Sequence, residues 1–216
     1  MHHPILTTLR INLDHPAARA ERLQPGPGRR PSPYPDVCKV HNRVVSAVAG
    51  LPENPDCRLL WAQPEPDLLI IRAFGPVTAA SFPAGYATVL SHRTWTPPPD
   101  GRVVGAITFS PQTVRHPRRA DRITRDTEVT VIRDPDAQVE FMRSRLAVAL
   151  DVTSLDVQWR RVRVGAHRTG RTVTSTQVGV VVTGTVTDHD VLVDKARRGW
   201  HKDKAWGCGL SVWKAA

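Results

Sequence analysis

The fold of this 216-residue chain is most evident in residues 172–213, TVTSTQVGVVVTGTVTDHDVLVDKARRGWHKDKAWGCGLSVW. A strand is predicted over Thr172–Val186 and a helix over Asp190–Arg198. Gly199 ends the helix, a turn rich in glycine and lysine follows, and a short apolar strand over Leu210–Trp213 closes the chain.

The residues before this stretch complete the unit. A strand is predicted over Val103–Phe109, a helix over Asp136–Leu150, and a strand over Leu155–Val164 that forms a long hairpin with Thr172–Val186. The second half of the chain, residues 101–216, therefore has the order β-α-β-β-α-β, which is that of a ferredoxin-like domain.

The first half, residues 1–100, begins in the same order. Its predicted elements are a strand over 5–13, a loop over 14–35, a helix over Asp36–Ala49, and strands over Cys57–Trp61 and Leu68–Phe74 joined by a turn at 63–66. Residues 75–96 favour no element. The prediction is an α+β protein with two tandem ferredoxin-like (RRM-like) βαββαβ domains, an N-terminal one over 1–96 and a C-terminal one over 102–216, with a proline-rich linker over 97–101.

The formal net charge of +10 favours an anionic partner. The balance of basic over acidic residues is +2 in the first half and +8 in the second, so the second half would supply most of the binding to a polyanion. Arginine accounts for 25 of the 30 basic residues, and its planar fork suits phosphate and guanine. A GC-rich genome also raises arginine content, so the arginine excess indicates a nucleic-acid partner less strongly than the net charge does.

Fifteen of the basic residues form three clusters in the second half, and this pattern indicates a nucleic-acid surface rather than a solvated basic face. One cluster follows the strand Val103–Phe109, one lies along the hairpin, and one flanks the glycine-rich turn. The members are Arg115, Arg118, Arg119, Arg122 and Arg125; Arg160, Arg161, Arg163, Arg168 and Arg171; and Lys195, Arg197, Arg198, Lys202 and Lys204.

Two interpretations fit the glycine-rich turn. Gly207 and Gly209, with Lys202 and Lys204 beside them, would let backbone N–H and ammonium groups contact phosphate. The turn is equally well explained as a plain helix-to-strand connection that begins with a glycine cap at Gly199.

The helix of the first half carries His41, which lies about 40° from Val37 and about 60° from Val44 at 100° per residue, at the edge of the predicted buried stripe. A histidine there is either a packed core residue or a general acid or base. As an acid or base it would exchange a proton with the 2′-OH or the leaving 5′-oxygen of RNA, a reaction that needs no metal. Tyr34 and Lys39 are close enough in sequence to assist, although each also suits a surface position.

Other chemistry is not indicated. Cys38, Cys57 and Cys208 show no C-x-x-C spacing, so neither a disulfide framework nor a zinc site is expected, and no metal or other cofactor is predicted. No HExxH, Walker A or GxSxG motif occurs, which argues against metalloproteases, P-loop enzymes and α/β-hydrolases. The sequence shows no signal core or membrane-spanning run, so we expect a cytoplasmic protein without membrane contact.

Three segments resemble the CasE family, the CRISPR repeat-RNA endoribonucleases of the type I-E Cascade complex. Tyr34–Val48 is similar to the catalytic helix of the family, with His41 in the place of its histidine, and Ile107–Arg115 is similar to a basic stretch L-R-A-N-P-x-K. The C-terminal segment is similar to the signature G-x-G-x-x-K-x-x-G-x-G-L, matched by Gly199, Lys204, Gly207, Gly209 and Leu210.

The resemblance implies a metal-independent endoribonuclease with two ferredoxin-like domains. Such an enzyme binds the stem-loop of CRISPR repeat RNA, cuts at the base of the stem to leave 5′-hydroxyl and 2′,3′-cyclic phosphate ends, and stays bound to the mature crRNA beside other Cascade subunits. The catalytic residues would be His41 and Tyr34. The RNA-binding residues would be Arg115, Arg118, Arg119, Arg160, Arg161, Arg163, Arg168, Arg171, Lys202, Lys204, Gly207 and Gly209.

The sequence departs from the family pattern at two places. His201 replaces the second glycine of the signature, and Cys38 stands three residues before His41, where the family often has a tyrosine. Tyr34 lies one more turn back, so its role in positioning or in acid catalysis stays open.

Three functions remain to be compared. RNA cleavage predicts cyclic phosphate products that depend on His41. A non-catalytic RNA-hairpin binding subunit of a ribonucleoprotein predicts tight binding without products. A DNA-binding regulator predicts that duplex DNA competes with an RNA hairpin.

Overall fold

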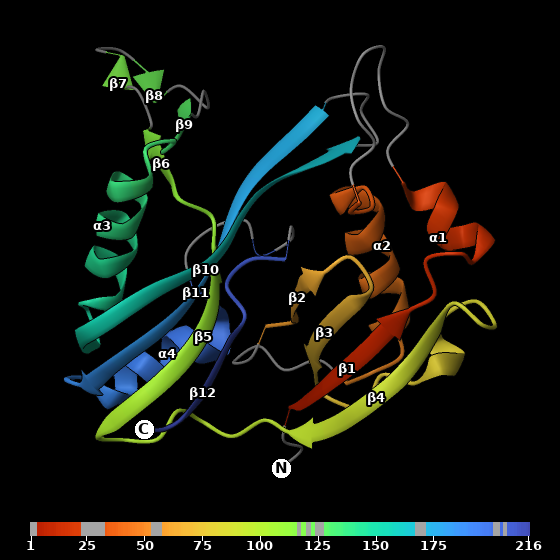
Figure 1. Ribbon diagram of the computed structural model, residues 1–216, viewed down its shortest axis with the longest axis horizontal. Helices are drawn as coiled ribbons and strands as arrows, with labels where there is room; N and C mark the ends of the chain where they lie inside the picture. The colour runs from red at the N-terminus through yellow and green to blue at the C-terminus, as the bar shows by residue number, and fades with distance from the viewer. Residues whose placement is uncertain are drawn as a thin grey trace.

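The computed structural model describes residues 4–22, 33–52, 58–115, 118–119, 122–123, 128–166, 172–200, 204 and 207–216, with only the backbone of 114–115, 118–119, 122–123, 128–129, 166 and 173. Two four-stranded antiparallel sheets dominate it (Figure 1). The strands of one sheet all lie in the first half of the chain and those of the other all lie in the second half.

The first sheet has the strand order β2-β3-β1-β4. Its strands are β1 (Ile5–Ile11), β2 (Leu60–Glu65), β3 (Leu68–Ala73) and β4 (Ala87–Thr94). The helices of this half are α1 (Pro16–Glu21), α2 (Val37–Val48) and the short 3₁₀ helix η1 (Ala79–Ser81). Helix α2 begins where the Asp36 carboxylate accepts hydrogen bonds from the backbone N–H groups of Cys38 and Lys39, at 2.8 and 3.2 Å.

One face of α2 packs on this sheet. Val37, Val40 and Val44 recur at helical spacing, are buried, and join Leu9 and Ile71 of the sheet in one apolar core. The predicted helix is therefore confirmed, and the same packing fixes which of its side chains point away from the sheet.

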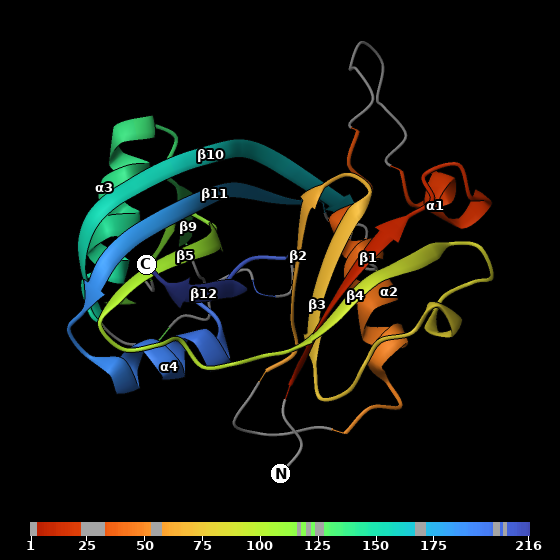
Figure 2. The same ribbon diagram turned by 60° about the horizontal axis from the view of Figure 1, so that its bottom comes forward.

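The second sheet has the order β10-β11-β5-β12. Its strands are β5 (Arg102–Phe109), β10 (Leu150–Ala166), β11 (Thr172–Val186) and β12 (Ser211–Ala215). Helices α3 (Pro135–Leu146) and α4 (His189–Arg198) cover one face of it (Figure 2), with Met142, Leu146 and Leu192 in the core. The connection between β5 and α3 holds the short strands β6 (Gln112–Arg115), β7 (Arg118–Arg119), β8 (Arg122–Ile123) and β9 (Glu128–Val131).

Both sheets have the strand order of the ferredoxin-like fold, so the predicted fold class is confirmed. The first half departs from it because its second helix is reduced to the three residues of η1. Residues 14–35 also contain a helix, α1, where a loop was expected. The domain limits at 96 and 102 stay a prediction; the strands of the two sheets end at Thr94 and begin at Arg102.

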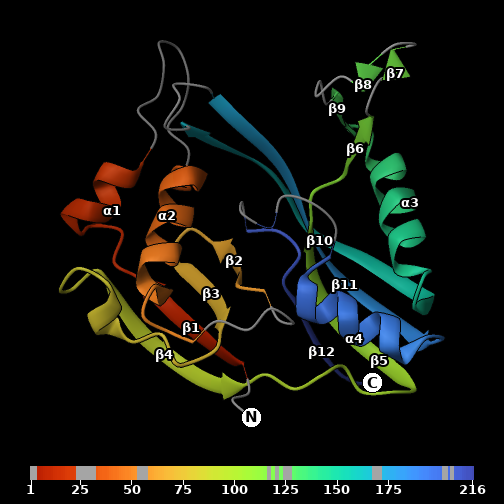
Figure 3. The same cartoon turned by 180° about the vertical axis from the view of Figure 1, so that it is seen from behind.

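The two sheets contact each other through the faces that carry no helix. Leu60 and Ala62 of β2 are buried with Leu210 of the C-terminal segment. An apolar pocket of about 140 Å³ lies nearby between β2 and β3 on one side and β5, β10 and β11 on the other. Seen from behind, the start of β2 also lies beside the end of α4 (Figure 3), where the N–H of Arg58 donates to the carbonyl of Arg197 at 3.3 Å.

Candidate active site and nucleic-acid interface

His41 projects from α2 beside its buried stripe and is half-buried. Burial lowers the pKa of the imidazole from its ordinary value of 6.5. The neutral form therefore predominates at pH 7, and a neutral imidazole can accept a proton.

The long β10–β11 hairpin of the second half crosses the first turn of α2. The end of β10 and the start of β11 lie beside that helix in Figure 1. A Cβ atom placed on Gly165 of β10 would lie 2.6 Å from the Cys38 sulfur and 2.9 Å from a carboxylate oxygen of Asp36, so only glycine permits this approach. The basic hairpin is thereby held one helical turn from His41.

Tyr34 precedes α2 and lies against two arginines of β10. Its hydroxyl donates to the carbonyl of Pro64 at 3.2 Å. The guanidinium carbons of Arg161 and Arg163 lie 4.3 and 5.2 Å from the centre of its ring. These are cation–π distances, and they connect the two halves of the chain.

All three guanidinium nitrogens of the half-buried Arg161 donate hydrogen bonds to protein groups. Its Nε donates to the side chain of Gln177 at 2.9 Å, Nη1 donates to the carbonyl of Pro64 at 3.0 Å, and Nη2 donates to the carbonyl of Gln63. The guanidinium also stacks 4.0 Å from the ring centre of Trp159.

Arg163 is 1% exposed, and its Nη2 donates to the carbonyl of Pro35 at 3.0 Å. Burial and the neighbouring Arg161 lower the pKa of this guanidinium to about 9, so it stays charged at neutral pH. Direct contact of Arg161 and Arg163 with RNA was predicted, and the hydrogen bonds of Arg161 and the burial of Arg163 do not fit that role. A strand alternates its side chains between two faces, and these two share the face toward the first half.

Arg160 lies on the other face of β10 and is exposed, with its Nε donating to the side chain of Gln138 at 3.0 Å. Its predicted contact with RNA stays a prediction. The predicted RNA-binding residues Arg168, Arg171 and Lys202 lie outside the described residues, as do the side chains of Arg115, Arg118 and Arg119.

The described glycines of the glycine-rich turn are buried between the two halves, with Gly199 against Leu60 and Gly207 against Trp61. Gly199, Gly207 and Gly209 have φ of 83°, 82° and 88°, which other residues rarely adopt. A Cβ on Gly207 would lie 2.8 Å from the Trp61 ring, and a Cβ on Gly209 would lie 2.6 Å from the carbonyl oxygen of Trp200. The phosphate contact predicted for Gly207 and Gly209 does not fit this burial, and the connection between α4 and β12 explains both glycines.

Lys204 is half-buried, and its aliphatic stem passes within 3.1 Å of a Cβ placed on Gly199. Burial, Arg58 and Lys195 lower the pKa of its ammonium group, in that order. Asp194 acts in the opposite direction, so Lys204 has both basic and acidic groups nearby, and its predicted RNA contact stays a prediction.

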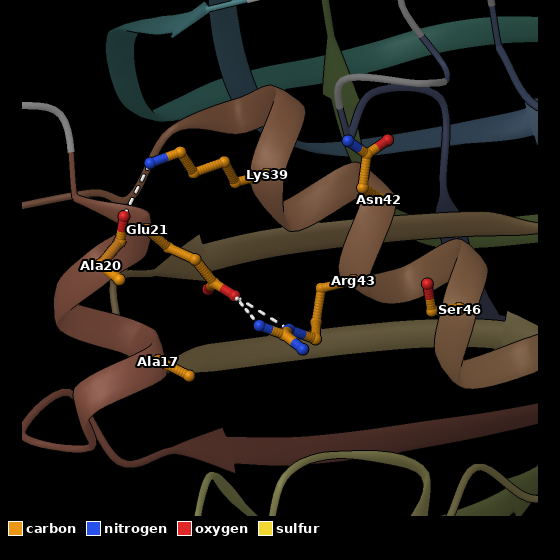
Figure 4. A pocket seen from close by; sticks show the side chains of 7 residues that line it. All are labelled: Ala17, Ala20, Glu21, Lys39, Asn42, Arg43 and Ser46. Carbon is orange, nitrogen blue, oxygen red and sulfur yellow. Dashed lines mark hydrogen bonds and ion pairs between the residues drawn. The ribbon is translucent and has the colours of Figure 1, made fainter. Parts of the chain in front are cut away.

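A polar network on the opposite side of α2 was not predicted. Glu21 of α1 is buried and accepts a hydrogen bond from the Tyr86 hydroxyl at 2.6 Å. Glu21 also pairs with Arg43 at 2.8 Å (Figure 4). Arg43 is about 160° from His41 around the helix. A pocket of about 540 Å³ lies here, lined by Ala17, Ala20, Glu21, Lys39, Asn42, Arg43 and Ser46.

Arg72 was missed as well, although a single arginine in the apolar strand LLIIRA was a usable signal. Its side chain is fully buried, lies 5.0 Å from the ring centre of Trp95, and donates to the carbonyls of Ala196 and Arg197 at the end of α4. A cation at these helix-end carbonyls satisfies acceptors that the helix itself leaves open.

Among the described residues, no group of three or more His, Cys, Asp or Glu side chains is arranged to hold a metal ion. Within the same part of the chain, no helix has the length and apolar character needed to cross a membrane.

No family model matches the sequence, and no curated protein matches it. Solved structures do match over nearly the whole chain. CRISPR endoribonuclease Cse3 bound to a 19-nucleotide RNA is 18% identical with a TM-score of 0.73, and 99% of each chain is covered. The CRISPR-associated protein Cas6e from Escherichia coli K-12 is 14% identical with a TM-score of 0.64, covering 98% of this chain and 100% of that one.

A chain of a CRISPR RNA-guided surveillance complex in a pre-nicking state is 17% identical with a TM-score of 0.67, covering 98% of this chain and 100% of that chain. The chain thus has the fold of the Cse3 and Cas6e proteins, and the resemblance to the CasE family is confirmed at the level of the fold.

Proposed function

We propose that this protein is an endoribonuclease that binds the stem-loop of CRISPR repeat RNA and cuts it with His41. The observation that carries the proposal is the approach of the basic hairpin to α2: Gly165 contacts Cys38, one turn before the half-buried His41. The shared fold with Cse3, which was solved with RNA bound, supports an RNA substrate.

The lowered pKa of His41 suits it to the role of general base. The neutral imidazole takes the proton of a 2′-OH, the 2′-oxygen attacks the adjacent phosphorus, and the bond to the 5′-oxygen breaks. The 5′-oxygen leaves with a proton from a general acid. The products are a 2′,3′-cyclic phosphate and a 5′-hydroxyl. The reaction consumes no water, and its atoms and protons balance without a metal ion.

Basic residues would hold the stem. Arg160 is exposed on the hairpin, and Lys204 lies near the basic side chains of Arg58 and Lys195 and near Asp194. After cleavage the protein would keep the mature crRNA as a subunit of a cytoplasmic Cascade complex, a role supported by the likeness to a chain of a surveillance complex.

Cleavage of a repeat-derived RNA hairpin in EDTA tests the proposal. We expect a single cut at the base of the stem, with cyclic phosphate and 5′-hydroxyl ends. A matched RNA with one 2′-deoxy nucleotide at the cut should bind and stay intact. Tight binding of both RNAs without products would instead support a non-catalytic binding subunit, and displacement of the RNA by duplex DNA would support a DNA-binding regulator.

A further inference from the structure

We infer that Tyr34, Trp159, Arg161 and Arg163, the Tyr34–arginine cluster, are positioning residues that hold α2 and its His41 against the RNA-binding hairpin. The inference rests on the proposed function and assigns Tyr34 a different role from proton transfer. It also gives Arg161 and Arg163 a role other than contact with RNA.

The cluster forms a continuous stack between the two halves. The guanidinium of Arg161 lies between two rings, 4.0 Å from the centre of Trp159 in its own strand and 4.3 Å from that of Tyr34 in the other half. Arg163 lies against the same tyrosine at 5.2 Å. A planar guanidinium suits this stacking, whereas the compact ammonium of lysine does not.

The cluster is fixed at two points of the first half. Arg161 and the Tyr34 hydroxyl both donate to the carbonyl of Pro64, near the end of β2. Arg163 donates to the carbonyl of Pro35, the residue before the Asp36 cap of α2. The start of the helix that carries His41 is therefore attached to β10.

The hydrogen bonds of Arg161 and the burial of Arg163 leave few guanidinium donors available to RNA. All three guanidinium nitrogens of Arg161 donate to protein acceptors, and Arg163 is 1% exposed. Among the described residues, Nε and Nη1 of Arg163 have no acceptor, so the Tyr34 ring and the carbonyl of Pro35 are the groups that contact its buried charge. Loss of this ring would loosen β10 from α2.

The test compares Tyr34→Phe, Tyr34→Leu and Arg161→Lys. Two values are measured for each: the cleavage rate constant at saturating protein, and the Kd for the uncleavable 2′-deoxy hairpin. Tyr34→Phe keeps the ring, so its rate constant should stay within about threefold of wild type, with the same pH profile. Tyr34→Leu and Arg161→Lys should lower the rate constant by about 10- to 100-fold, because small misplacements of a catalytic group cost this much. Their Kd should change by less than about threefold.

Arg10→Lys is the matched control, the same substitution in an exposed side chain of β1 that pairs with Asp67 at 3.5 Å, and its rate constant and Kd should both equal those of wild type. A loss of more than about 100-fold in Tyr34→Phe would place the hydroxyl in proton transfer and overturn the inference. Arg161→Lys with wild-type rate and wild-type Kd would also overturn it. So would Arg161→Lys with a weakened Kd, since that result indicates direct contact with RNA.

Hydrogen exchange of the β10 and β11 amides gives a reading independent of cleavage. Exchange should rise in Tyr34→Leu and Arg161→Lys and stay unchanged in Tyr34→Phe; equal exchange in all of them overturns the inference. Wild-type protein that does not cut RNA defeats the proposed function alone, because the exchange result still decides whether the cluster holds the hairpin. If Tyr34→Leu does not fold, Arg161→Lys and Tyr34→Phe decide.

Discussion

The two halves of the molecule are joined at two ends of one interface, and arginine side chains cross the interface in opposite directions at the two ends. At one end, Arg161 and Arg163 of the second half reach carbonyls of the first half beside Tyr34. At the other end, Arg72 of the first half reaches the last carbonyls of α4 beside Trp95. The first end adjoins the helix that carries His41, so we expect the first end to control the reaction and the second to control stability.

The largest expected effect is at the first end. His41→Ala removes the base and should lower the cleavage rate constant by about 10²- to 10⁴-fold, while the Kd for the uncleavable hairpin stays the same. Single-turnover cleavage and filter binding measure the two values. Cleavage by His41→Ala at the wild-type rate would show that His41 is not the base and that this end of the interface does not control the reaction.

At the second end, Arg72→Met keeps the length of the side chain and removes the charged donors. The carbonyl of Ala196 then loses the Arg72 donor, and the carbonyl of Arg197 keeps only the N–H of Arg58 at 3.3 Å, so the free energy of unfolding should fall by about 2–4 kcal/mol. Denaturant titration measures this loss. A variant that keeps its stability and loses cleavage would contradict the expectation that the second end controls stability.

A smaller loss is expected from Gly207→Ala, in the turn between the two ends. The positive φ alone costs about 1–2 kcal/mol for alanine, and the new methyl group would also meet Trp61 at 2.8 Å. The matched control is Gly50→Ala, where a Cβ would have no neighbour within 4 Å and the stability should change by less than about 0.5 kcal/mol. Equal stability of the two variants would contradict the packing assigned to the turn.

The smallest expected effect separates the two faces of β10. Arg160→Gln should lower the slope of log Kd against log salt by about one, as for one lost phosphate contact. Arg161→Gln should leave this slope unchanged, because its guanidinium contacts protein. Equal slopes in both variants would show that the face does not decide which arginine reaches RNA.

Periodicity was sufficient to predict α2, the long hairpin and α4, because long amphipathic elements carry a repeated signal. It failed at α1, which is only six residues long within a stretch rich in proline and arginine. It also misplaced β2, since Pro64 indicated a turn. Pro64 lies in an edge strand, where a missing N–H costs no ladder hydrogen bond.

The site was predicted less completely than the fold. Helical geometry placed His41 at the edge of the buried stripe, and the structure agrees. The arginines of β10 were taken as one basic cluster, although the alternation of a strand already separates Arg160 from Arg161 and Arg163. Which face meets Tyr34 depends on packing between segments over a hundred residues apart, and no local pattern in the sequence encodes that contact.

The pH dependence of single-turnover cleavage tests the central claim most directly. His41 must be neutral to accept the 2′-OH proton, and burial lowers its pKa below 6.5. The rate constant should therefore rise with pH through an inflection below 6.5 and be level by neutral pH, and this inflection should be absent from the residual activity of His41→Ala. A rate constant that falls with rising pH through this range, or an inflection that persists in His41→Ala, would contradict the assignment of His41 as the base.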